Sequence, residues 1–215
     1  MKNKTIREIT DNKIIIILRG VERDKIIPLC EALYSGGIRL VEITYSADGT
    51  TPDRVTAESI RLLSNAFKGK MTIGAGTVLT KEQVRLTAEA GGKFIISPDT
   101  REAVIEETVR LGLVSIPGAL TPTEAQSAHV YGADFVKLFP ISSLGPSYIK
   151  AISAPLSHIK FLAVGGVNEK NIGEFIRAGA VGVGIGGNIT SLLKEDNYEA
   201  ITEMAKKYVE GAINV

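Results

Sequence analysis

Short runs of apolar, mostly β-branched residues recur along the chain, each followed by a turn rich in Gly, Pro or Thr and then by a longer amphipathic stretch. Such runs are typical of strands buried on both faces, and their alternation with helical patterns predicts a parallel sheet. The predicted strands are 13–19, 38–44, 71–76, 94–97, 114–117, 134–139, 160–164 and 181–185. Eight such units in 215 residues predict an α/β fold, a (β/α)8 barrel that forms a single domain over 1–215, with a doubly wound open sheet as the alternative.

Signals for the ends of helices support this division. Capping-box pairs, in which a hydroxyl or carboxylate precedes Glu or Gln by three residues, predict helix starts. They are Thr80 with Gln83, Thr121 with Glu124 and, more weakly, Asp99 with Glu102. Glycines that precede the next strand predict helix ends in the left-handed conformation. They are Gly36–Gly37, Gly91–Gly92, Gly112, Gly132 and Gly179.

Composition narrows the classes of function. The 25 basic and 24 acidic residues nearly cancel and aromatic residues make up only 6% of the chain, which argues against nucleic-acid and membrane partners. Cys30 is the single cysteine, so neither an intramolecular disulfide nor a thiolate metal site is expected. His129 and His158 lie outside any metal-binding pattern, and we expect no metal. The absence of a signal core or a long apolar run predicts a cytoplasmic enzyme.

Unusual residues gather at the carboxyl ends of the predicted strands, where barrel enzymes build their active sites. Lys137 lies in the sixth run, and strand alternation places it on one face with Phe135 and Phe139. Because a charged amine facing the helices would be costly, we expect Lys137 to face the barrel mouth, where burial lowers its pKa and leaves a nucleophilic amine. A lysine held in a salt bridge without chemistry is the alternative.

Glu42 occupies the corresponding position in the second run, between Val41 and Ile43. Burial raises the pKa of such a carboxyl and a nearby cation lowers it, so a glutamate balanced between the two can exchange protons near neutral pH. An ion-pair partner of Lys137 or Arg19 is the alternative role. Gly165–Gly166 and Gly186–Gly187 each precede a predicted helix, and either pair serves as a phosphate site or simply as a tight turn.

With these residues in view, the chain resembles the 2-keto-3-deoxy-6-phosphogluconate / 4-hydroxy-2-oxoglutarate (KDPG/KHG) aldolase family, from Lys13 past Asn188. The motifs that carry the resemblance are Val41–Thr44, Gly74–Leu79, Ser97–Pro98, Lys137–Pro140 and Gly165–Gly166. The resemblance implies a metal-free and cofactor-free class I aldolase, typically a homotrimer. It implies that Lys137 forms the Schiff base and that Glu42 carries protons. The substrate residues it implies are Thr77 and Arg19 for the carboxylate, Pro98 and Phe139 for the pocket wall, and Gly165, Gly166, Gly187 and Asn188 around the phosphate.

The implied reaction is cleavage of 2-dehydro-3-deoxy-6-phosphogluconate, or of 4-hydroxy-2-oxoglutarate, to pyruvate and an aldehyde. Two departures from the family pattern keep the 6-phosphogalactonate epimer open as a substrate. Ser46 stands in the stretch where some members carry a carboxylate-binding Arg, so Arg19 takes that role, and Val164 replaces a frequent Thr. A phosphosugar isomerase or epimerase, and a non-catalytic sensing barrel, are competing hypotheses for the same fold.

Overall fold

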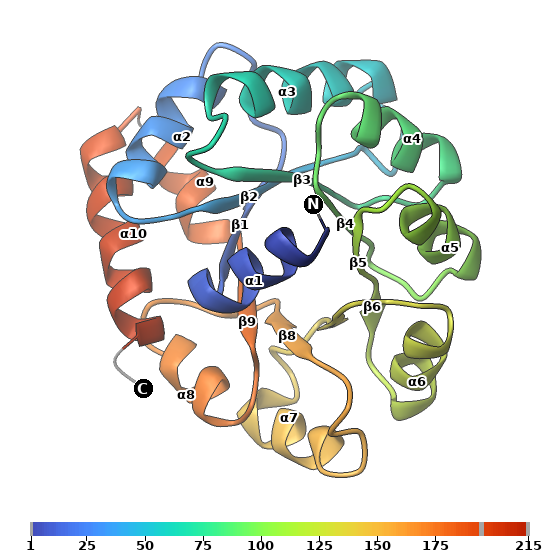
Figure 1. Ribbon diagram of the computed structural model, residues 1–215. Coiled ribbons are helices and arrows are strands. Elements are labelled where there is room, and N and C mark those ends of the chain that lie inside the picture. Colours follow the sequence, from blue (N-terminus) through green and yellow to red (C-terminus); the bar gives the residue numbers. More distant parts are fainter. Residues whose placement is uncertain (1, 194–195, 214–215) are drawn as a thin grey trace.

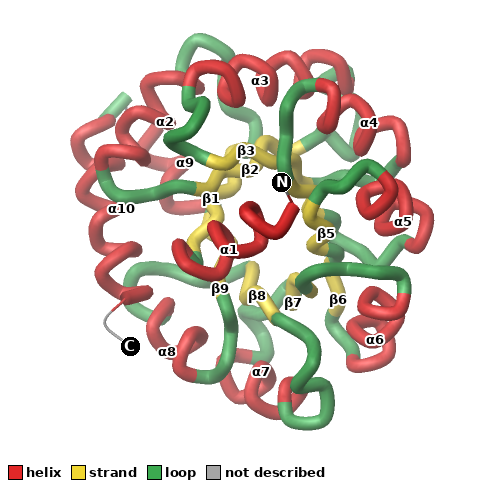
Figure 2. The backbone as a smooth tube through the Cα atoms, viewed as in Figure 1, coloured by secondary structure: helices red, strands yellow, loops and turns green. Residues whose placement is uncertain are grey.

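A ring of short parallel strands, surrounded by helices, forms the centre of the molecule (Figures 1 and 2). The computed structural model describes residues 2–193 and 196–213. In that part of the chain the strands are β1 (Ile14–Leu18), β2 (Leu40–Thr44), β3 (Thr72–Gly76), β4 (Phe94–Ile96), β5 (Val114–Ile116), β6 (Gly118–Ala119), β7 (Val136–Leu138), β8 (Phe161–Val164) and β9 (Gly182–Ile185). The helices are α1 (Lys2–Asn12), α2 (Ile26–Ser35), α3 (Asp53–Ala66), α4 (Lys81–Glu89), α5 (Glu102–Arg110), α6 (Pro122–Val130), α7 (Gly145–Ser153), α8 (Ile172–Arg177), α9 (Gly187–Leu193) and α10 (Tyr198–Ile213).

The sheet closes into the predicted barrel. Its strand order is β5-β4-β3-β2-β1-β9-β8-β7-β6, so β5 and β6 stand at the two ends. The predicted run 114–117 contains β5 and ends at Pro117, which has no N–H to donate to a ladder, whereas β6 was not predicted. The Lys137 amide donates to the Pro117 carbonyl at 2.8 Å, and the Phe135 amide donates to Ser115 at 3.2 Å. The run therefore bonds to β4 on one side and to β7 on the other, and the open-sheet alternative is wrong.

Strand alternation divides the core into two layers, as expected for a barrel. Val136 and Leu138 belong to the large cluster between the strands and the surrounding helices, whereas Phe135 belongs to the cluster inside the ring. The interior cluster contains Ile9, Ile15, Leu40, Phe94, Ile96, Val114, Ile116, Phe135 and Leu162. These side chains fill the barrel below the carboxyl ends of the strands, which leaves the upper end for polar groups.

Helix α1 was not predicted, and it lies across one end of the barrel (Figure 1). Lys2 forms a 3.0 Å ion pair with Asp134, just before β7, and Glu8 accepts a hydrogen bond from Thr72 at the start of β3. Both contacts are at the amino ends of strands. Ile9 is fully buried against the interior cluster, so α1 covers the end of the barrel opposite the polar residues.

Most of the predicted helix ends are confirmed, and one is wrong. Thr121 and Glu124 form a complete capping box, and the Thr80 side chain accepts from the Gln83 amide. The N-cap of α5, however, is Arg101, without a side-chain cap. Asp99 instead accepts a 2.9 Å hydrogen bond from the Arg101 guanidinium, because this cation competes for the carboxylate that would otherwise cap the helix.

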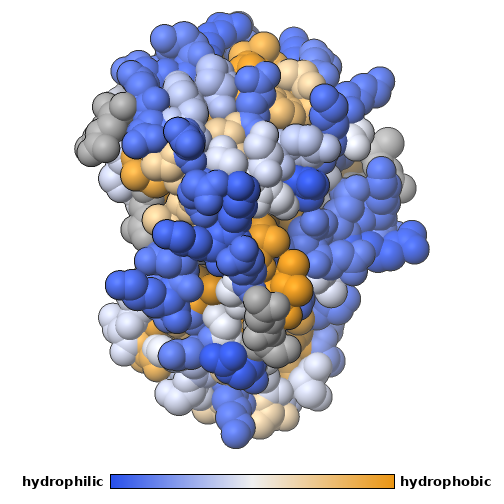
Figure 3. Space-filling view, turned by 90° about the vertical axis from the view of Figure 1, so that its left-hand side faces the viewer, coloured by the Kyte–Doolittle hydropathy of each residue, from blue (hydrophilic) through white to orange (hydrophobic). Residues whose placement is uncertain are grey.

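The surface agrees with the near-neutral composition. On the face of Figure 3, hydrophilic side chains separate small apolar patches. Among the described helices, none combines the length and the apolar character needed to cross a membrane.

Candidate active site

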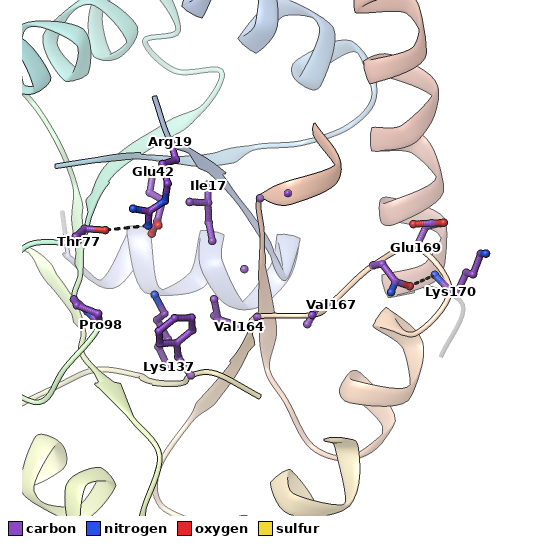
Figure 4. Close-up of a pocket in the computed structure, with 17 residues that line it drawn as sticks. Ile17, Arg19, Glu42, Thr77, Pro98, Lys137, Val164, Val167, Glu169 and Lys170 are labelled. Atoms are coloured by element: carbon purple, nitrogen blue, oxygen red, sulfur yellow. Dashed lines mark hydrogen bonds between the residues drawn. The ribbon is translucent and has the colours of Figure 1, made fainter. Parts of the chain in front are cut away.

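A cavity of about 550 Å³ opens at the carboxyl ends of the strands (Figure 4). Nine of the ten residues predicted for the site line it. They are Arg19, Glu42, Thr77, Pro98, Lys137, Phe139, Gly165, Gly166 and Gly187. The tenth, Asn188, lies in α9, and its side chain is outside the described part of the structure. The strands thus bring together residues that are up to 168 positions apart in the chain, from Arg19 to Gly187.

Lys137 is the central residue of β7, and its side chain points into the cavity (Figure 4). Only 7% of the residue is exposed. Its Nζ lies 4.6 Å from the centre of the Phe139 ring, on the same face of the strand. Burial lowers the pKa of the Lys137 ammonium below its ordinary value, Glu42 opposes this shift, and Arg19 adds to it. Burial in the site therefore increases the share of the neutral amine, which is the nucleophilic form.

Glu42 faces the same cavity from β2, and 2% of it is exposed. Burial raises the pKa of its carboxyl to about 7, against the opposing influence of Lys137 and Arg19. Its Oε2 atom is buried and has no hydrogen-bond partner in the described structure. A buried carboxyl with one unsatisfied oxygen and a pKa near neutrality is suited to take a proton from a bound molecule and to return it.

Gly76 provides the room that the Glu42 carboxylate occupies. In the register of β2 and β3, Gly74 lies opposite Glu42, and Gly76 lies two positions further on, opposite Thr44. A Cβ atom placed on Gly76 would overlap Oε1 of Glu42 and would lie 2.7 Å from its Cδ. The second glycine of the Gly74–Thr77 motif is therefore required by the close approach of an acidic side chain.

Arg19 and Thr77 form one end of the cavity. The Arg19 Nη2 donates to the Thr77 Oγ1 at 3.2 Å, as the dashed line in Figure 4 marks. Thr77 has a φ of 53°, which is unusual for a β-branched residue and indicates that its surroundings hold it in place. A guanidinium and a hydroxyl so arranged can hold a carboxylate.

Glycines form another part of the wall. Gly165 and Gly166 have φ values of 95° and 79°, so both need glycine for conformational reasons. A Cβ on Gly166 would also lie 2.6 Å from the Cβ of Ser142. Gly187 begins α9, and both segments line the cavity. The backbone conformation of Gly165 and Gly166 is therefore that of a tight turn. Because neither residue has a side chain, the backbone of this turn faces the cavity directly.

Several lining residues were not predicted. Ile17 and Gly184 are the inward-facing positions of β1 and β9, and alternation from Arg19 would have identified Ile17. Glu169 and Lys170 lie far from Thr77 across the cavity, on the loop after β8 (Figure 4). Asn168 orders this loop by accepting a hydrogen bond from the Lys170 amide at 2.9 Å. A loop position of this kind has no periodic signal in the sequence.

Elsewhere in the described structure, no group of three or more His, Cys, Asp or Glu side chains is arranged to hold a metal ion. His129 and His158 pack edge to face with ring centres 4.7 Å apart, at the surface beside α6. Cys30 is buried in α2.

Comparison with known proteins shows the family to which the chain belongs. Residues 5–204 match the family model described as KDPG and KHG aldolase. The chain is 38% identical, over 177 residues, to 2-dehydro-3-deoxy-6-phosphogalactonate aldolase of Escherichia coli K12, and the match covers 82% of this chain and 83% of that protein. It is 29% identical over 219 residues to the KHG/KDPG aldolase of the same strain, with 99% of both chains covered.

A crystal structure of KDPG aldolase from Legionella pneumophila, with pyruvate captured as a covalent carbinolamine intermediate, superimposes with a TM-score of 0.83. That protein is 30% identical, and the match covers 96% of this chain and 97% of the other. The family match over most of the chain, the common barrel and the buried lysine at its mouth agree with one another. The chain belongs to the KDPG and KHG aldolase family and is a carbon–carbon lyase.

Proposed function

We propose that this chain is a class I aldolase in which Lys137 forms an imine with a 2-keto-3-deoxy-6-phospho sugar acid and Glu42 carries the protons. The observation that carries the proposal is the presence of a buried amine and a buried carboxyl in one cavity. The pKa of each group is shifted by burial toward its neutral form. An imine-forming enzyme needs both a free amine and a group that can give and take protons near neutral pH.

The first half of the reaction builds an electron sink. The neutral Lys137 amine attacks the 2-keto carbon and gives a carbinolamine. Glu42 in its acid form donates a proton to the departing hydroxyl, and water leaves as the protonated imine forms. Glu42 is then a carboxylate, ready to act as a base.

The second half breaks the carbon–carbon bond. The Glu42 carboxylate removes the proton of the C4 hydroxyl, and the electrons of the C3–C4 bond flow into the imine. The aldehyde departs and leaves an enamine of pyruvate on Lys137. Glu42 returns its proton to C3, and water hydrolyses the imine to release pyruvate and the free amine.

The two charged ends of the substrate orient it. Arg19 and Thr77 hold the carboxylate next to the reacting carbon, and the glycine loops Gly165–Gly166 and Gly187 hold the phosphate. Phe139 and Pro98 form the walls of the cavity. Fixing both ends places the keto carbon beside Lys137 and supplies several kcal/mol of the reduction in the barrier.

The aldehyde half of the substrate is the remaining question. 2-Dehydro-3-deoxy-6-phosphogluconate gives glyceraldehyde 3-phosphate, and 4-hydroxy-2-oxoglutarate gives glyoxylate. The 6-phosphogalactonate epimer is a second candidate, because the E. coli relative named for it is 38% identical to this chain, against 29% for the KHG/KDPG aldolase. Rates of pyruvate release from the three compounds decide the order of preference.

The imine is tested with pyruvate and sodium borohydride, followed by intact mass measurement. We expect one reduced pyruvate per chain in the wild type and none in Lys137→Met. Lys160→Met is the matched control. The Nζ of Lys160 also lies over an aromatic ring, 5.6 Å from the centre of the Phe135 ring, but Lys160 does not line the cavity. Trapping in the Lys137 variant contradicts the proposal. An active enzyme that traps no pyruvate favours a reaction without an imine, as in a phosphosugar isomerase.

A homotrimer and a cytoplasmic location complete the proposal. Val130, which is 70% exposed, and Val109, at 38%, lie on the neighbouring helices α6 and α5 and offer an apolar surface for a subunit contact. The single cysteine is a free, buried thiol, which suits a reducing compartment. Light scattering of the purified protein tests the trimer.

A further inference from the structure

We propose a second binding site, for a small phosphate-bearing anion, at the amino end of the barrel. A pocket of about 480 Å³ lies there between α1, the turn that joins α3 to β3, and the segments that lead into β2 and β4. Its volume is in the range of ordinary small-molecule sites. It shares no lining residue with the cavity that contains Lys137, and α1 together with the interior cluster separates the two.

The charge of the pocket wall is strongly unbalanced. Its cationic side chains come from four separate segments of the chain, and they are Lys4, Arg39, Lys68, Lys70 and Lys93. Among the described residues that line the pocket, the only carboxylate is that of Glu8. Five cations and one carboxylate (5 − 1) give the pocket wall a formal charge of +4, whereas the whole chain has a net charge of +1.

The single carboxylate does not neutralise these cations. Glu8 accepts a hydrogen bond from Thr72 and forms a 3.5 Å ion pair with Lys4. Within residues 2–193 and 196–213, no carboxylate forms an ion pair with Lys68, Lys70 or Lys93. Gathering like charges around a concave surface is unfavourable unless an anion joins them, and a concave wall also concentrates their field.

Two further groups make the pocket more than a set of surface lysines. Arg39 is fixed, because its Nη1 donates to the carbonyls of Tyr34 and Ile38 at 2.9 Å and its guanidinium lies 4.2 Å from the centre of the Tyr34 ring. Ser64 also lines the pocket, and its Oγ is buried without a hydrogen-bond partner in the described structure. A pre-oriented guanidinium binds phosphate oxygens well, and the Ser64 hydroxyl is a polar group of the wall that no protein group satisfies.

The side chains that line the pocket favour a small anion over a nucleic acid. No aromatic side chain is among the described residues that line the pocket, so bases have no surface on which to stack. The ligand class is therefore a phosphate monoester or inorganic phosphate, which share the same recognition chemistry.

The test compares Lys70→Gln/Lys93→Gln with Lys81→Gln/Lys207→Gln, a control that removes the same charge from residues outside this pocket. Isothermal titration with inorganic phosphate, and separately with glycerol 1-phosphate, measures binding to each full-length protein. We expect a second binding event in the wild type and in the control. In the pocket variant this event should be about tenfold weaker, since each exposed ion pair contributes up to a few-fold.

Pyruvate-release kinetics separate this proposal from the catalytic one, because the pocket variant should keep the KM and kcat of the wild type. Identical isotherms for the pocket variant and the wild type overturn the second site. So does wild-type protein that binds a single-stranded oligonucleotide or anionic vesicles through these lysines but neither phosphate probe. Loss of both binding and cleavage in the variant also overturns it, since the pocket would then not be independent of the active site.

Discussion

Gly76→Ala tests directly whether the position of the Glu42 carboxylate controls the reaction. The substitution adds one methyl group at a strand position whose backbone φ does not require glycine. That methyl group overlaps Oε1 of Glu42 and lies 3.1 Å from the Thr44 Cγ2, which is a close contact. The Glu42 side chain is the flexible partner, so it must move.

The size of the movement follows from the geometry. Ordinary contact begins at 3.4 Å, and the added Cβ would lie 2.7 Å from the Glu42 Cδ and nearer still to Oε1, so the carboxyl must shift by at least about 0.7 Å. A misplacement of about 1 Å in a catalytic site can cost a hundredfold in rate. We therefore expect kcat to fall by about tenfold to a hundredfold, which corresponds to about 1.4 to 2.7 kcal/mol.

The assay is pyruvate release across pH, together with borohydride trapping. Trapping should persist, because Lys137 itself is untouched. The control is Gly112→Ala, in which the φ of 70° makes alanine unfavourable by about 1 kcal/mol while no heavy atom lies within 4 Å of the new methyl group. A loss of stability alone would slow both variants in the same way, and a displaced carboxyl would slow only Gly76→Ala.

A double-mutant cycle with Glu42→Asp provides the refuting result. The shorter side chain leaves room for the methyl group, so Gly76→Ala should cost much less in the Glu42→Asp background than in the wild type. Equal costs in the two backgrounds, or a Gly76→Ala enzyme within about threefold of the wild type, would show that the carboxyl position does not limit the reaction.

Three further substitutions have simpler outcomes. Burial raises the pKa of the Glu42 carboxyl from 4.5 to about 7, so the folded wild type loses up to about 3 kcal/mol of stability as the pH rises through that range. The Glu42→Gln variant should not show this loss in urea unfolding measured across pH. Equal pH dependence in the two proteins would contradict the prediction. Arg19→Gln should raise KM about tenfold, with kcat within a few-fold, because a charge-assisted hydrogen bond to the carboxylate is lost; an unchanged KM would remove Arg19 from the site. Thr121→Ala removes the N-cap of α6, so thermal unfolding should show a loss of about 1 kcal/mol at unchanged kcat.

Much of the fold was predictable from the sequence because local patterns decide it. The eight βα units, the cap at Thr121 and the inward direction of Lys137 and Glu42 all follow from periodicity and from the cost of placing charge against apolar helices. The end of β5 before Pro117 also follows from the sequence, because proline has no N–H to donate to a strand ladder. The glycine motifs and the lysine motif likewise predicted which family the chain belongs to.

Other features depend on which segments meet in space. α1 covers the barrel because its short apolar face packs on the interior cluster. Arg101 also donates to the Leu79 carbonyl, 22 positions away, at 3.1 Å while it contacts Asp99. The Arg19–Thr77 hydrogen bond, the room that Gly76 leaves for Glu42 and the cations around the amino-end pocket join residues from different strands and turns.

The sequence by itself therefore determined the elements, the faces of the strands and the chemical groups available at the mouth of the barrel, since these depend on neighbouring residues. Only the tertiary structure decided how deeply Lys137 and Glu42 are buried, which groups surround them and hence how far their pKa values move. The reason is physical: desolvation and Coulomb interactions depend on distances between segments that are remote in the chain, and barrel closure sets those distances.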